Sequence, residues 1–587
     1  MYFELLPNEI LLDDLFIYLN GTDLFHGFYG LNSRFNALLY KQFRFYHFDF
    51  ESVSKRTFDL ICQQHLPLIA NRIIALRISN YKIIGQCDLF VSYISSFHQM
   101  TCLRSLTIHK LRSYKIFIEL LDKCHQLNNF TCLNVNHCHF PKEESNFSLI
   151  IDKIWSLPKL TDCHFRNIIT RSYYFRVPTI ISTSIEHLTI FHSELSSDKI
   201  NQLFNYTPRL KRLSMIVMSL PNNNYISSLH SKLIQLYMYF LYRINASTMP
   251  DFLKSMPNLC HLEINLRRNL IDGHQWEHII RNYLPILKTF RLKMRWFPRD
   301  QKIIQKEAEK LFDSFRSSFW IYEKQWFVRC FIGEQVISLN TLSNRPDVYE
   351  TFSGLCKYTC SDDDYRKYYN CMTTIDNITF FNNPIPSTIR LSNITYLCIK
   401  LPYNTQFWSI VPNLNKLKTL ILSSYDGNLE SELQAILDRA PYLTTLAIHQ
   451  DASISIQMSL FKLTNPSIRE LDLKNYAHYF NENECLLLTR SLLGIQCEIL
   501  SIRINNREDI ITLVKNMVNL RILRIYRSEK RYLDSDHIYL KRNNDETFRE
   551  RDNINTNELI QWLKDQLPST CVVVKDLHSV HNILIWI

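Results

Sequence analysis

The pattern apolar-x-x-apolar-x-apolar recurs along most of this 587-residue chain and limits the fold more than any other feature. There are fifteen copies, most of them about 23–30 residues apart. The last two apolar positions alternate with polar ones, which is the pattern of a strand with one buried face. The copies are Ile73-Leu76-Ile78, Leu103-Leu106-Ile108, Phe130-Leu133-Val135, Leu160-Cys163-Phe165, Ile185-Leu188-Ile190, Leu210-Leu213-Met215, Leu233-Leu236-Met238, Leu259-Leu262-Ile264, Leu287-Phe290-Leu292, Ile394-Leu397-Ile399, Leu417-Leu420-Leu422, Leu443-Leu446-Ile448, Ile468-Leu471-Leu473, Cys497-Leu500-Ile502 and Leu520-Leu523-Ile525.

A segment with helical character precedes many of these strands and often ends near a proline, as at 253–257 and 433–441. One strand and one helix bury too little apolar surface to be stable alone. Stacked neighbours, in contrast, build one continuous core with parallel strands along one side. Fifteen units in phase therefore predict a repeat solenoid.

The period and the pattern resemble those of leucine-rich repeats over residues 70–292 and 394–526. The copy at 130–135 continues to Cys138, where that family has an asparagine or cysteine that holds the turn. Most other copies lack such a residue, so their turns must be held in another way. The resemblance implies an α/β solenoid of irregular leucine-rich repeats, with parallel strands lining one face and helices the other.

The chain between the two repeat arrays has a different pattern. Residues 301–315 have the spacing of an amphipathic helix, and the aromatic runs 319–322 and 326–331 are typical of strands. After the last repeat, a helix and two strands at 572–574 and 583–587 are expected to cover the exposed sheet edge. The predicted divisions are an all-α helical module at 3–48, a first solenoid part at 49–295, an inserted helix plus β-rich element at 296–390, a second solenoid part at 391–530 and a C-terminal cap at 531–587.

The first fifty residues predict three short helices. Pro7 suits a helix start, where the missing N–H is no loss. Apolar residues then recur at helical spacing until Asn20-Gly21 ends the first helix, and Thr22 or Asp23 is placed to cap the second. So small a unit buries little surface by itself, which leaves apolar side chains for a partner to cover.

This stretch resembles the F-box family through an ordered set of residues within 3–48. The set is Leu6-Pro7-x-Glu9-Ile10-Leu11, Leu19, Asp23-Leu24, Leu31-Asn32-x-Arg34-Phe35 and Leu38. The resemblance implies docking onto the Skp-type adaptor of a cullin–RING ubiquitin ligase. The residues implied to contact that adaptor or to shape its docking surface are Leu6, Pro7, Glu9, Ile10, Leu11, Leu24, Leu31 and Phe35.

Two positions depart from the F-box pattern. The segment at Asp13-Asp14-Leu15 has one residue more than the usual spacing, and one extra residue turns a helix by about 100°. Adaptor contacts of this helix are therefore not carried over beyond Leu12. Phe35 stands where the family often has tryptophan. The alternative for the whole stretch is an ordinary N-terminal helical cap on a larger domain.

An F-box joined to leucine-rich repeats implies a substrate-recognition subunit of an SCF-type ubiquitin ligase. Such a chain is not an enzyme, because associated subunits transfer the ubiquitin. The alternative is a ligase-independent scaffold that binds protein or RNA. The net charge of +11 permits RNA, but acidic residues are spread throughout, as at 362–364, which makes nucleic acid the less favoured partner.

The sequence offers little for catalysis or cofactor binding. Its 9 glycines include no phosphate-binding loop, so no cofactor is expected. The densest group of metal-ligand residue types sits in or beside a repeat strand, so burial without metal is predicted. Its members are Cys124, His125, Cys132, His137, Cys138 and His139. Unpaired cysteines, no signal pattern and no membrane-length apolar run predict a cytoplasmic or nuclear protein without membrane contact.

The target surface is predicted on the repeat strands, where residues flanking the buried positions point to the open face. Tyrosine and arginine are favoured in protein interfaces, and basic residues in line suit an acidic or phosphorylated segment of a target protein. A solvated polar face without a ligand is the alternative. The candidate residues are Tyr237, Tyr239, Glu263, Arg267, Arg291, Lys293, Arg295, Arg503 and Arg524.

Overall fold

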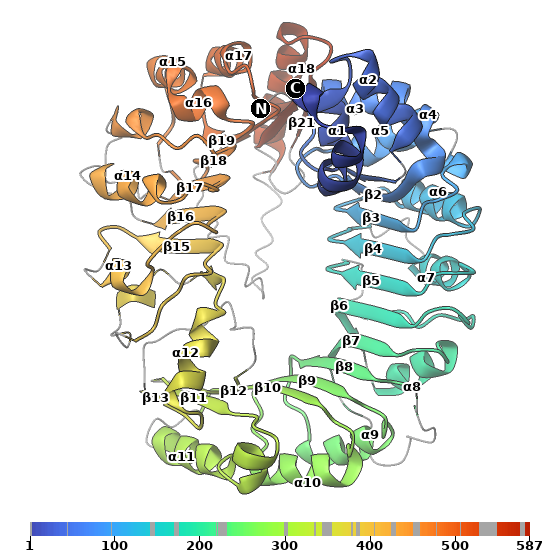
Figure 1. Cartoon of the computed structure of the whole chain (residues 1–587), viewed down its shortest axis with the longest axis vertical. Helices are drawn as coiled ribbons and strands as arrows, with labels where there is room; N and C mark the ends of the chain where they lie inside the picture. The colour runs from blue at the N-terminus through green and yellow to red at the C-terminus, as the bar shows by residue number, and fades with distance from the viewer. Residues whose placement is uncertain are drawn as a thin grey trace.

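In the computed structural model the chain forms a ring with strands on its inner side and helices on its outer side, and the two ends of the chain lie close together (Figure 1). The structure describes residues 3–587 except 44, 95–96, 141–146, 169–174, 196, 219, 221–229, 231, 299–302, 334–335, 343–354, 377, 379, 383–384, 386–387, 404–405, 424–429, 450–457, 477, 505, 527–548 and 576–581. In this part of the chain a 13-stranded sheet is followed by a 9-stranded sheet.

The strand order is β1 to β10, then β12, β11 and β13 in the first sheet, and β14 to β20, then β22 and β21 in the second. The strands of the first sheet are β1 Tyr46–Asp49, β2 Ile73–Ser79, β3 Ser105–His109, β4 Cys132–Asn136, β5 Asp162–Arg166, β6 His187–Leu195, β7 Arg212–Val217, β8 Gln235–Phe240, β9 His261–Arg267, β10 Thr289–Trp296, β11 Val328–Ile332, β12 Ile337–Thr341 and β13 Leu355–Tyr358. Those of the second are β14 Thr374–Ile375, β15 Tyr396–Lys400, β16 Thr419–Ser423, β17 Thr445–His449, β18 Glu470–Asp472, β19 Ile499–Arg503, β20 Ile522–Tyr526, β21 Val572–Lys575 and β22 Ile583–Trp586. The α-helices are α1 Gly21–Phe28, α2 Ser33–Ala37, α3 Lys55–Leu60, α4 Leu66–Ile69, α5 Gln86–Tyr93, α6 Tyr114–Cys124, α7 Phe147–Trp155, α8 Ser197–Tyr206, α9 Met249–Lys254, α10 Gly273–Tyr283, α11 Ile304–Ser314, α12 Asp362–Asn370, α13 Phe407–Ile410, α14 Glu430–Asp438, α15 Glu482–Arg490, α16 Leu492–Gln496, α17 Arg507–Asn516 and α18 Arg549–Gln566.

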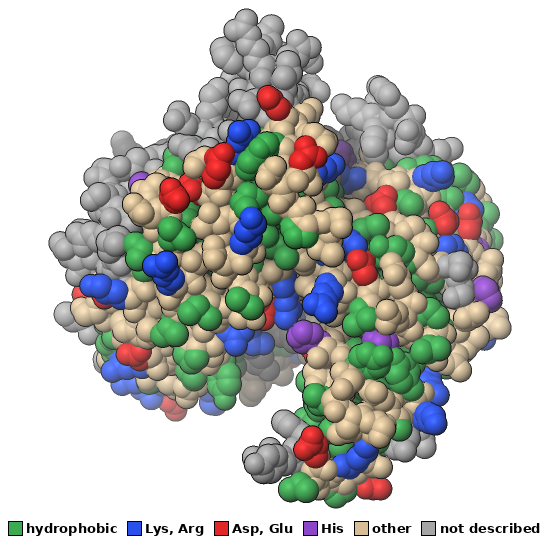
Figure 2. All heavy atoms as spheres, turned by 90° about the horizontal axis from the view of Figure 1, so that it is seen from above, with side chains coloured by type: hydrophobic (Ala, Val, Ile, Leu, Met, Phe, Trp, Pro, Cys, Tyr) green, Lys and Arg blue, Asp and Glu red, His purple; other side chains and the backbone are tan. Residues whose placement is uncertain are grey.

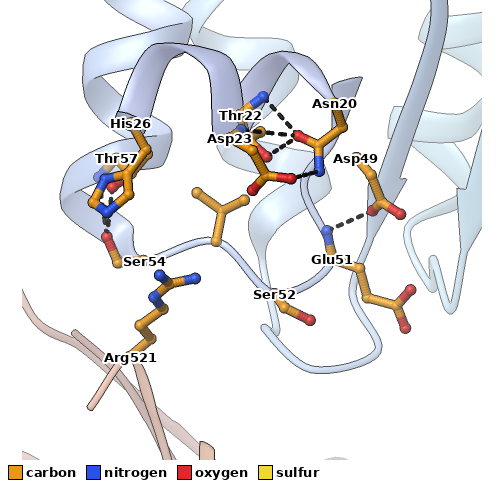
Figure 3. A pocket seen from close by; sticks show the side chains of 11 residues that line it. Asn20, Thr22, Asp23, His26, Asp49, Glu51, Ser52, Ser54, Thr57 and Arg521 are labelled. Carbon is orange, nitrogen blue, oxygen red and sulfur yellow. Dashed lines mark hydrogen bonds between the residues drawn. The ribbon is translucent and has the colours of Figure 1, made fainter. Parts of the chain in front are cut away.

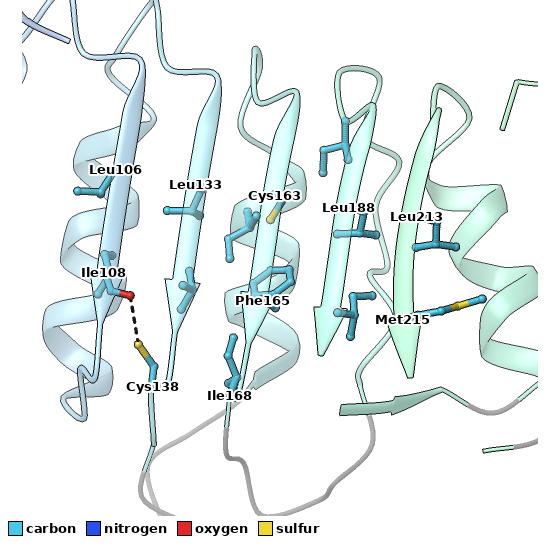
Figure 4. Packing of buried hydrophobic residues seen from close by; sticks show 14 of the residues in the cluster. Leu106, Ile108, Leu133, Cys138, Cys163, Phe165, Ile168, Leu188, Leu213 and Met215 are labelled. Carbon is cyan, nitrogen blue, oxygen red and sulfur yellow. Dashed lines mark hydrogen bonds between the residues drawn. The ribbon is translucent and has the colours of Figure 1, made fainter. Parts of the chain in front are cut away.

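Parallel pairing places the repeat residues in continuous rows. Leu76 pairs with Leu106, and the row continues strand by strand to Phe290 of β10. The second sheet repeats it from Leu397 to Leu523, and Figure 4 shows such rows side by side across β3 to β7. Burying one such side chain contributes about 1.5–3 kcal/mol, and a one-residue slip would expose the whole set. The register confirms the predicted α/β solenoid.

Left-handed backbone residues hold several turns, including the turn after β4 that carries Cys138. Lys110, His137, Asn167 and Arg268 each follow a strand directly, with φ between 53° and 74°. The N–H of each donates to a carbonyl of the next strand at 2.6–3.1 Å. This conformation is unfavourable for residues other than glycine. A hydrogen bond between main chains, rather than a side-chain ladder, therefore joins these repeats.

The segment between the arrays extends the first sheet. β12 pairs antiparallel with β10, and β11 and β13 follow. The helix expected at 301–315 is confirmed as α11. The strand expected at 319–322 is wrong, because Phe319–Glu323 forms a π-helical turn. This turn buries Trp320 among aromatic rings, with its indole N–H donating to the Gly273 carbonyl at 3.2 Å. Tertiary packing thus overrides the strand preference of aromatic residues.

The N-terminal helices pack on β1 and share the buried core of the first repeats. The cap of α1 is Asn20, not Thr22 or Asp23, since the Asn20 side-chain oxygen accepts from the N–H groups of those two residues. A glycine is needed next, because a Cβ on Gly21 would lie 2.5 Å from the Phe48 ring. The helical module therefore caps the solenoid, whatever else it does.

A wide helical turn accommodates the extra residue near Asp14. Ile10–Leu15 is π-helical, and the N–H of Phe16 donates to the Leu11 carbonyl, five residues back. A π turn takes up one residue more than an α turn. Leu11 and Phe16 consequently both remain in the core, with no exposed surface.

The last strand closes the ring against the first helices. β22 pairs with β20, as predicted for a strand that covers the sheet edge. The fully buried Trp586 ring lies 5.2 Å from the Phe58 ring, and its N–H donates to the Val53 carbonyl at 2.8 Å. The Lys55 N–H donates to the Ile587 carbonyl at 2.8 Å. Both ends of the described chain therefore share one core.

Acid is expected to destabilise the contact between the module and the first repeat. His65 is buried, stacks on Phe25 and is hydrogen-bonded to the Tyr40 hydroxyl, and burial lowers its pKa to about 4. The unfolded chain keeps a histidine pKa of about 6.5, so it binds more protons between about pH 6.5 and 4, and stability falls with falling pH. Thermal unfolding at pH 7 and pH 5 should show a larger loss in wild type than in His65→Phe. Equal losses would contradict this role.

Candidate functional sites on the helical module and the inner face

The helical module carries large apolar side chains that face solvent. Leu5 and Tyr18 expose 80% and 81% of their surface, and Leu31 exposes 58%. Ile10 and Ile17 are about half exposed. Large apolar residues exposed within one small unit are typical of a surface that another molecule covers. These five residues are called the module patch below.

Arg34 fixes the segment that carries part of this patch. Its guanidinium donates to the Asn8 side chain at 2.9 Å and to the Glu4 carbonyl at 2.6 Å, and it also donates to the Leu6 carbonyl. The side chain of Asn32 caps α2, the helix that carries Arg34. The two parts of the F-box-like pattern, around Leu6 and around Arg34, are thereby tied together.

Replacing Arg34 by methionine is expected to loosen this segment. A hydrogen bond to a charged group contributes about 1.5–3 kcal/mol, so a loss of roughly 2 kcal/mol is expected in denaturant unfolding. Limited proteolysis should then cut the chain first within residues 3–9. Arg56→Met is the matched control, because Arg56 is an exposed residue of α3. A loss no larger than in the control would contradict the role of Arg34.

The residues predicted to contact the adaptor fall into two groups. The accessible ones, exposed or half-buried, are Leu6, Pro7, Glu9, Ile10 and Leu31. The ones without exposed surface are Leu11, Leu24 and Phe35. These three side chains belong to the buried core of the module. In this conformation they can shape the docking surface, but they cannot contact the adaptor directly.

Seven of the nine residues predicted for the target surface come together on three neighbouring strands of the inner side. They are Tyr237 and Tyr239 of β8, Glu263 and Arg267 of β9, and Arg291, Lys293 and Arg295 of β10. All seven are half-buried. The Arg291 guanidinium lies 3.4 Å from the Glu263 carboxylate. Solenoid register, which the sequence period already indicates, is what brings these residues together.

The other two residues, Arg503 and Arg524, lie in the second sheet, on the other arm of the ring (Figure 1). Arg503 donates to the Lys474 carbonyl at 2.7 Å. The Arg524 guanidinium lies 3.6 Å from Glu470, and the same carboxylate lies 3.4 Å from Lys82 across the closure of the ring. These two arginines therefore lie apart from the surface on β8–β10, and both contact neighbouring repeats.

A polar cavity of about 240 Å³ lies where the module meets the last repeat (Figure 3). Asp23 and His26 of α1, Glu51 of the loop after β1, and Arg521 line it together with hydroxyl side chains. Burial raises the pKa of Asp23, and the nearby Arg521 opposes the rise. Burial also raises the pKa of Glu51. No sequence pattern predicts this cavity, because its walls come from segments that are far apart in the chain.

The predicted burial of the metal-ligand residue types is confirmed for Cys124 and Cys138, which have no exposed surface. It is wrong for His137 and His139, which are exposed beside the turn after β4. Burial raises the pKa of Cys138 to about 12, and its thiol lies 3.9 Å from the Ile108 carbonyl oxygen (Figure 4). Within the described residues, no group of three or more His, Cys, Asp or Glu side chains is arranged to hold a metal ion. No helix in the described part of the chain is long and apolar enough to cross a membrane.

Comparison with known proteins adds little to this geometry. No family model matches the sequence, and no curated protein matches it. Similar solved structures include a leucine-rich-repeat protein of Leptospira interrogans, with 13% identity and a TM-score of 0.21 over 82% of this chain and 95% of that one. The Toll–Spätzle complex of Drosophila matches with 12% identity and a TM-score of 0.20 over 77% of this chain and 46% of that chain. Such values do not establish a shared fold, so the assignment of a repeat solenoid rests on the strand register.

Proposed function

We propose that this chain is a substrate-recognition subunit of an SCF-type ubiquitin ligase in the cytoplasm or nucleus. The helical module docks a Skp-type adaptor and, through it, a cullin, while the inner face of the ring holds a target protein. The observation that carries the proposal is the module patch, five large apolar side chains exposed on a short unit whose sequence resembles an F-box. Associated subunits perform the ubiquitin transfer, and this chain is not an enzyme.

Physical features of the module favour docking. Covering apolar surface contributes about 25 cal/mol for each Å² removed from water. Arg34 and the buried Leu11, Leu24 and Phe35 hold the patch in one arrangement, so little conformational freedom is lost on binding. Because the packed core stabilises the module, the module can remain folded while the side chains of the patch are exposed to solvent.

Titration calorimetry with a purified Skp-type adaptor and the full chain tests the proposal. We expect a one-to-one complex with a dissociation constant of about 1 μM or tighter, equivalent to about −8 kcal/mol. No heat of binding and no co-elution in gel filtration would leave the module as a cap alone, and the chain as a ligase-independent scaffold.

A further inference from the structure

Four basic side chains meet on the inner side of the ring. Arg267 ends β9, and Arg291, Lys293 and Arg295 lie along β10. These four residues are called the basic face below. On the inner-facing positions of β8, β9 and β10, all of which the structure describes, Glu263 is the single acidic residue. The basic face therefore carries an excess of positive charge.

The fold compensates this excess only in part, because Glu263 pairs with Arg291 but not with Arg267 or Arg295. Arg267 and Arg295 lie directly opposite each other in register, and like charges so placed on neighbouring strands repel. Neither guanidinium forms an ion pair or a side-chain hydrogen bond with the residues that the structure describes. The Nε of Arg291 is also buried without a hydrogen-bond partner. Anionic oxygens from a ligand would relieve the repulsion and satisfy these donors.

Two arginines at comparable inner positions of other strands have carboxylate partners. Arg77 of β2 lies 3.2 Å from Asp49 and also pairs with Glu51. Arg524 of β20 lies 3.6 Å from Glu470. On the face seen in Figure 2, basic and acidic side chains are likewise interspersed. Arg77 and Arg524 are thus compensated by carboxylates, as Arg291 is by Glu263. Arg267 and Arg295 differ in having no such partner among the residues that the structure describes.

The spacing of the basic face indicates the shape of a ligand. Arg291, Lys293 and Arg295 stand two residues apart, and a strand rises about 3.3 Å per residue, so neighbouring positions are about 6.6 Å apart. An extended peptide presents alternate side chains to one face with the same period. Acidic groups at every second residue of such a peptide would meet successive basic side chains.

We infer that the basic face binds an extended acidic segment whose anionic groups, carboxylates or phosphates, stand at alternate positions. The inference rests on the proposed function, in which this segment belongs to the target protein. RNA is less favoured, because a nucleic-acid track needs a longer basic groove. Here Glu263 interrupts the charge, and the flanking strand β12 carries the neutral residues Ser338 and Asn340 opposite Arg295 and Lys293.

Fluorescence anisotropy with the full chain and no adaptor tests the inference. Two labelled peptides of identical composition carry glutamates either at alternate positions or in one block, a third carries phosphoserines at the alternate positions, and the fourth probe is a mixed-sequence RNA. We expect the alternating peptides to bind best, and the difference between glutamate and phosphoserine to identify the source of the charge. Affinity should fall steeply with salt.

Arg267→Gln and Arg295→Gln are each expected to weaken binding of the alternating peptide about tenfold, or ~1.4 kcal/mol. Arg316→Gln is the matched control, because this arginine is exposed and pairs with Asp313 outside the basic face. Equal binding of block and alternating peptides, unchanged affinity in both variants, no peptide binding, or tighter binding of RNA would each overturn the inference. Because the assay contains no adaptor, its result is independent of whether the module docks one.

Discussion

Aspartate at both Ile10 and Leu31 is expected to abolish binding of the Skp-type adaptor while the chain remains folded. Both side chains are exposed, so the substitutions remove no core contact. In the complex, each carboxylate would lose water against an apolar partner, which costs several kcal/mol per unpaired charge. The dissociation constant should rise more than 100-fold, equivalent to about 2.8 kcal/mol. Calorimetric titration measures the binding, and circular dichroism checks the fold.

Tyr442→Asp is the matched control for this pair, because Tyr442 is 65% exposed and lies between α14 and β17, several repeats away from the module. It adds the same charge to an exposed apolar position and should leave adaptor affinity unchanged. Unchanged affinity of the double variant, or an equal loss in the control, would contradict docking through the module patch.

Trp586→Ala is expected to open the ring and to reduce the free energy of unfolding by about 3–5 kcal/mol, the range for truncating a buried aromatic side chain. Trp586 has no exposed surface, packs on Phe58 and donates to the Val53 carbonyl at 2.8 Å. Its removal leaves a void at the contact between the C-terminal strand and the first helices. Denaturant unfolding measures the loss, and small-angle X-ray scattering should show a larger radius of gyration.

Two further tryptophan variants separate closure from general destabilisation. Trp586→Phe keeps most of the packing and removes the indole hydrogen bond, so a loss of about 1 kcal/mol with a closed ring is expected. Trp562→Ala removes a half-buried tryptophan of α18 that contacts Arg507 outside the closure, and should leave the ring closed. A scattering curve of Trp586→Ala identical to wild type would contradict the role of Trp586 in closing the ring.

Repeat periodicity predicts those parts of the fold in which each residue's environment is set by its own strand and the next one. The rows from Leu76 to Phe290 follow from alternation and period alone, and so does the grouping of Tyr237, Glu263 and Arg291 on adjacent strands. The same period therefore also predicts which inner-facing side chains lie next to one another on adjacent strands.

Contacts between distant segments are not predictable in this way. Residues 319–323 form a π-helical turn because Trp320 is buried. This burial depends on packing against Phe290 and Phe315. The closure of the ring brings Lys82 to Glu470, which in turn engages Arg524. Nothing near these residues in the sequence indicates their partners, so the pairing of Arg524 with Glu470 is not predictable.

Closure of the ring also affects the two proposed roles, adaptor docking by the helical module and target binding by the inner face. The helical module shares its core with the first repeats, and Val53 and Lys55, just beyond the module, contact the last strand. The module patch is therefore fixed relative to the basic face rather than tethered by a flexible linker. In the proposed ligase, a target segment held on β9 and β10 would be presented in a defined position, which raises its effective concentration near the transferring subunits.

Hydrogen–deuterium exchange of the full chain with and without the Skp-type adaptor tests the central claim most directly, because it locates the docking surface. Bound adaptor is expected to slow exchange in peptides that cover residues 5–18 and 29–37, which include the whole module patch, and to leave β9 and β10 unchanged. No protection in these module peptides, or protection confined to the solenoid, would contradict the account.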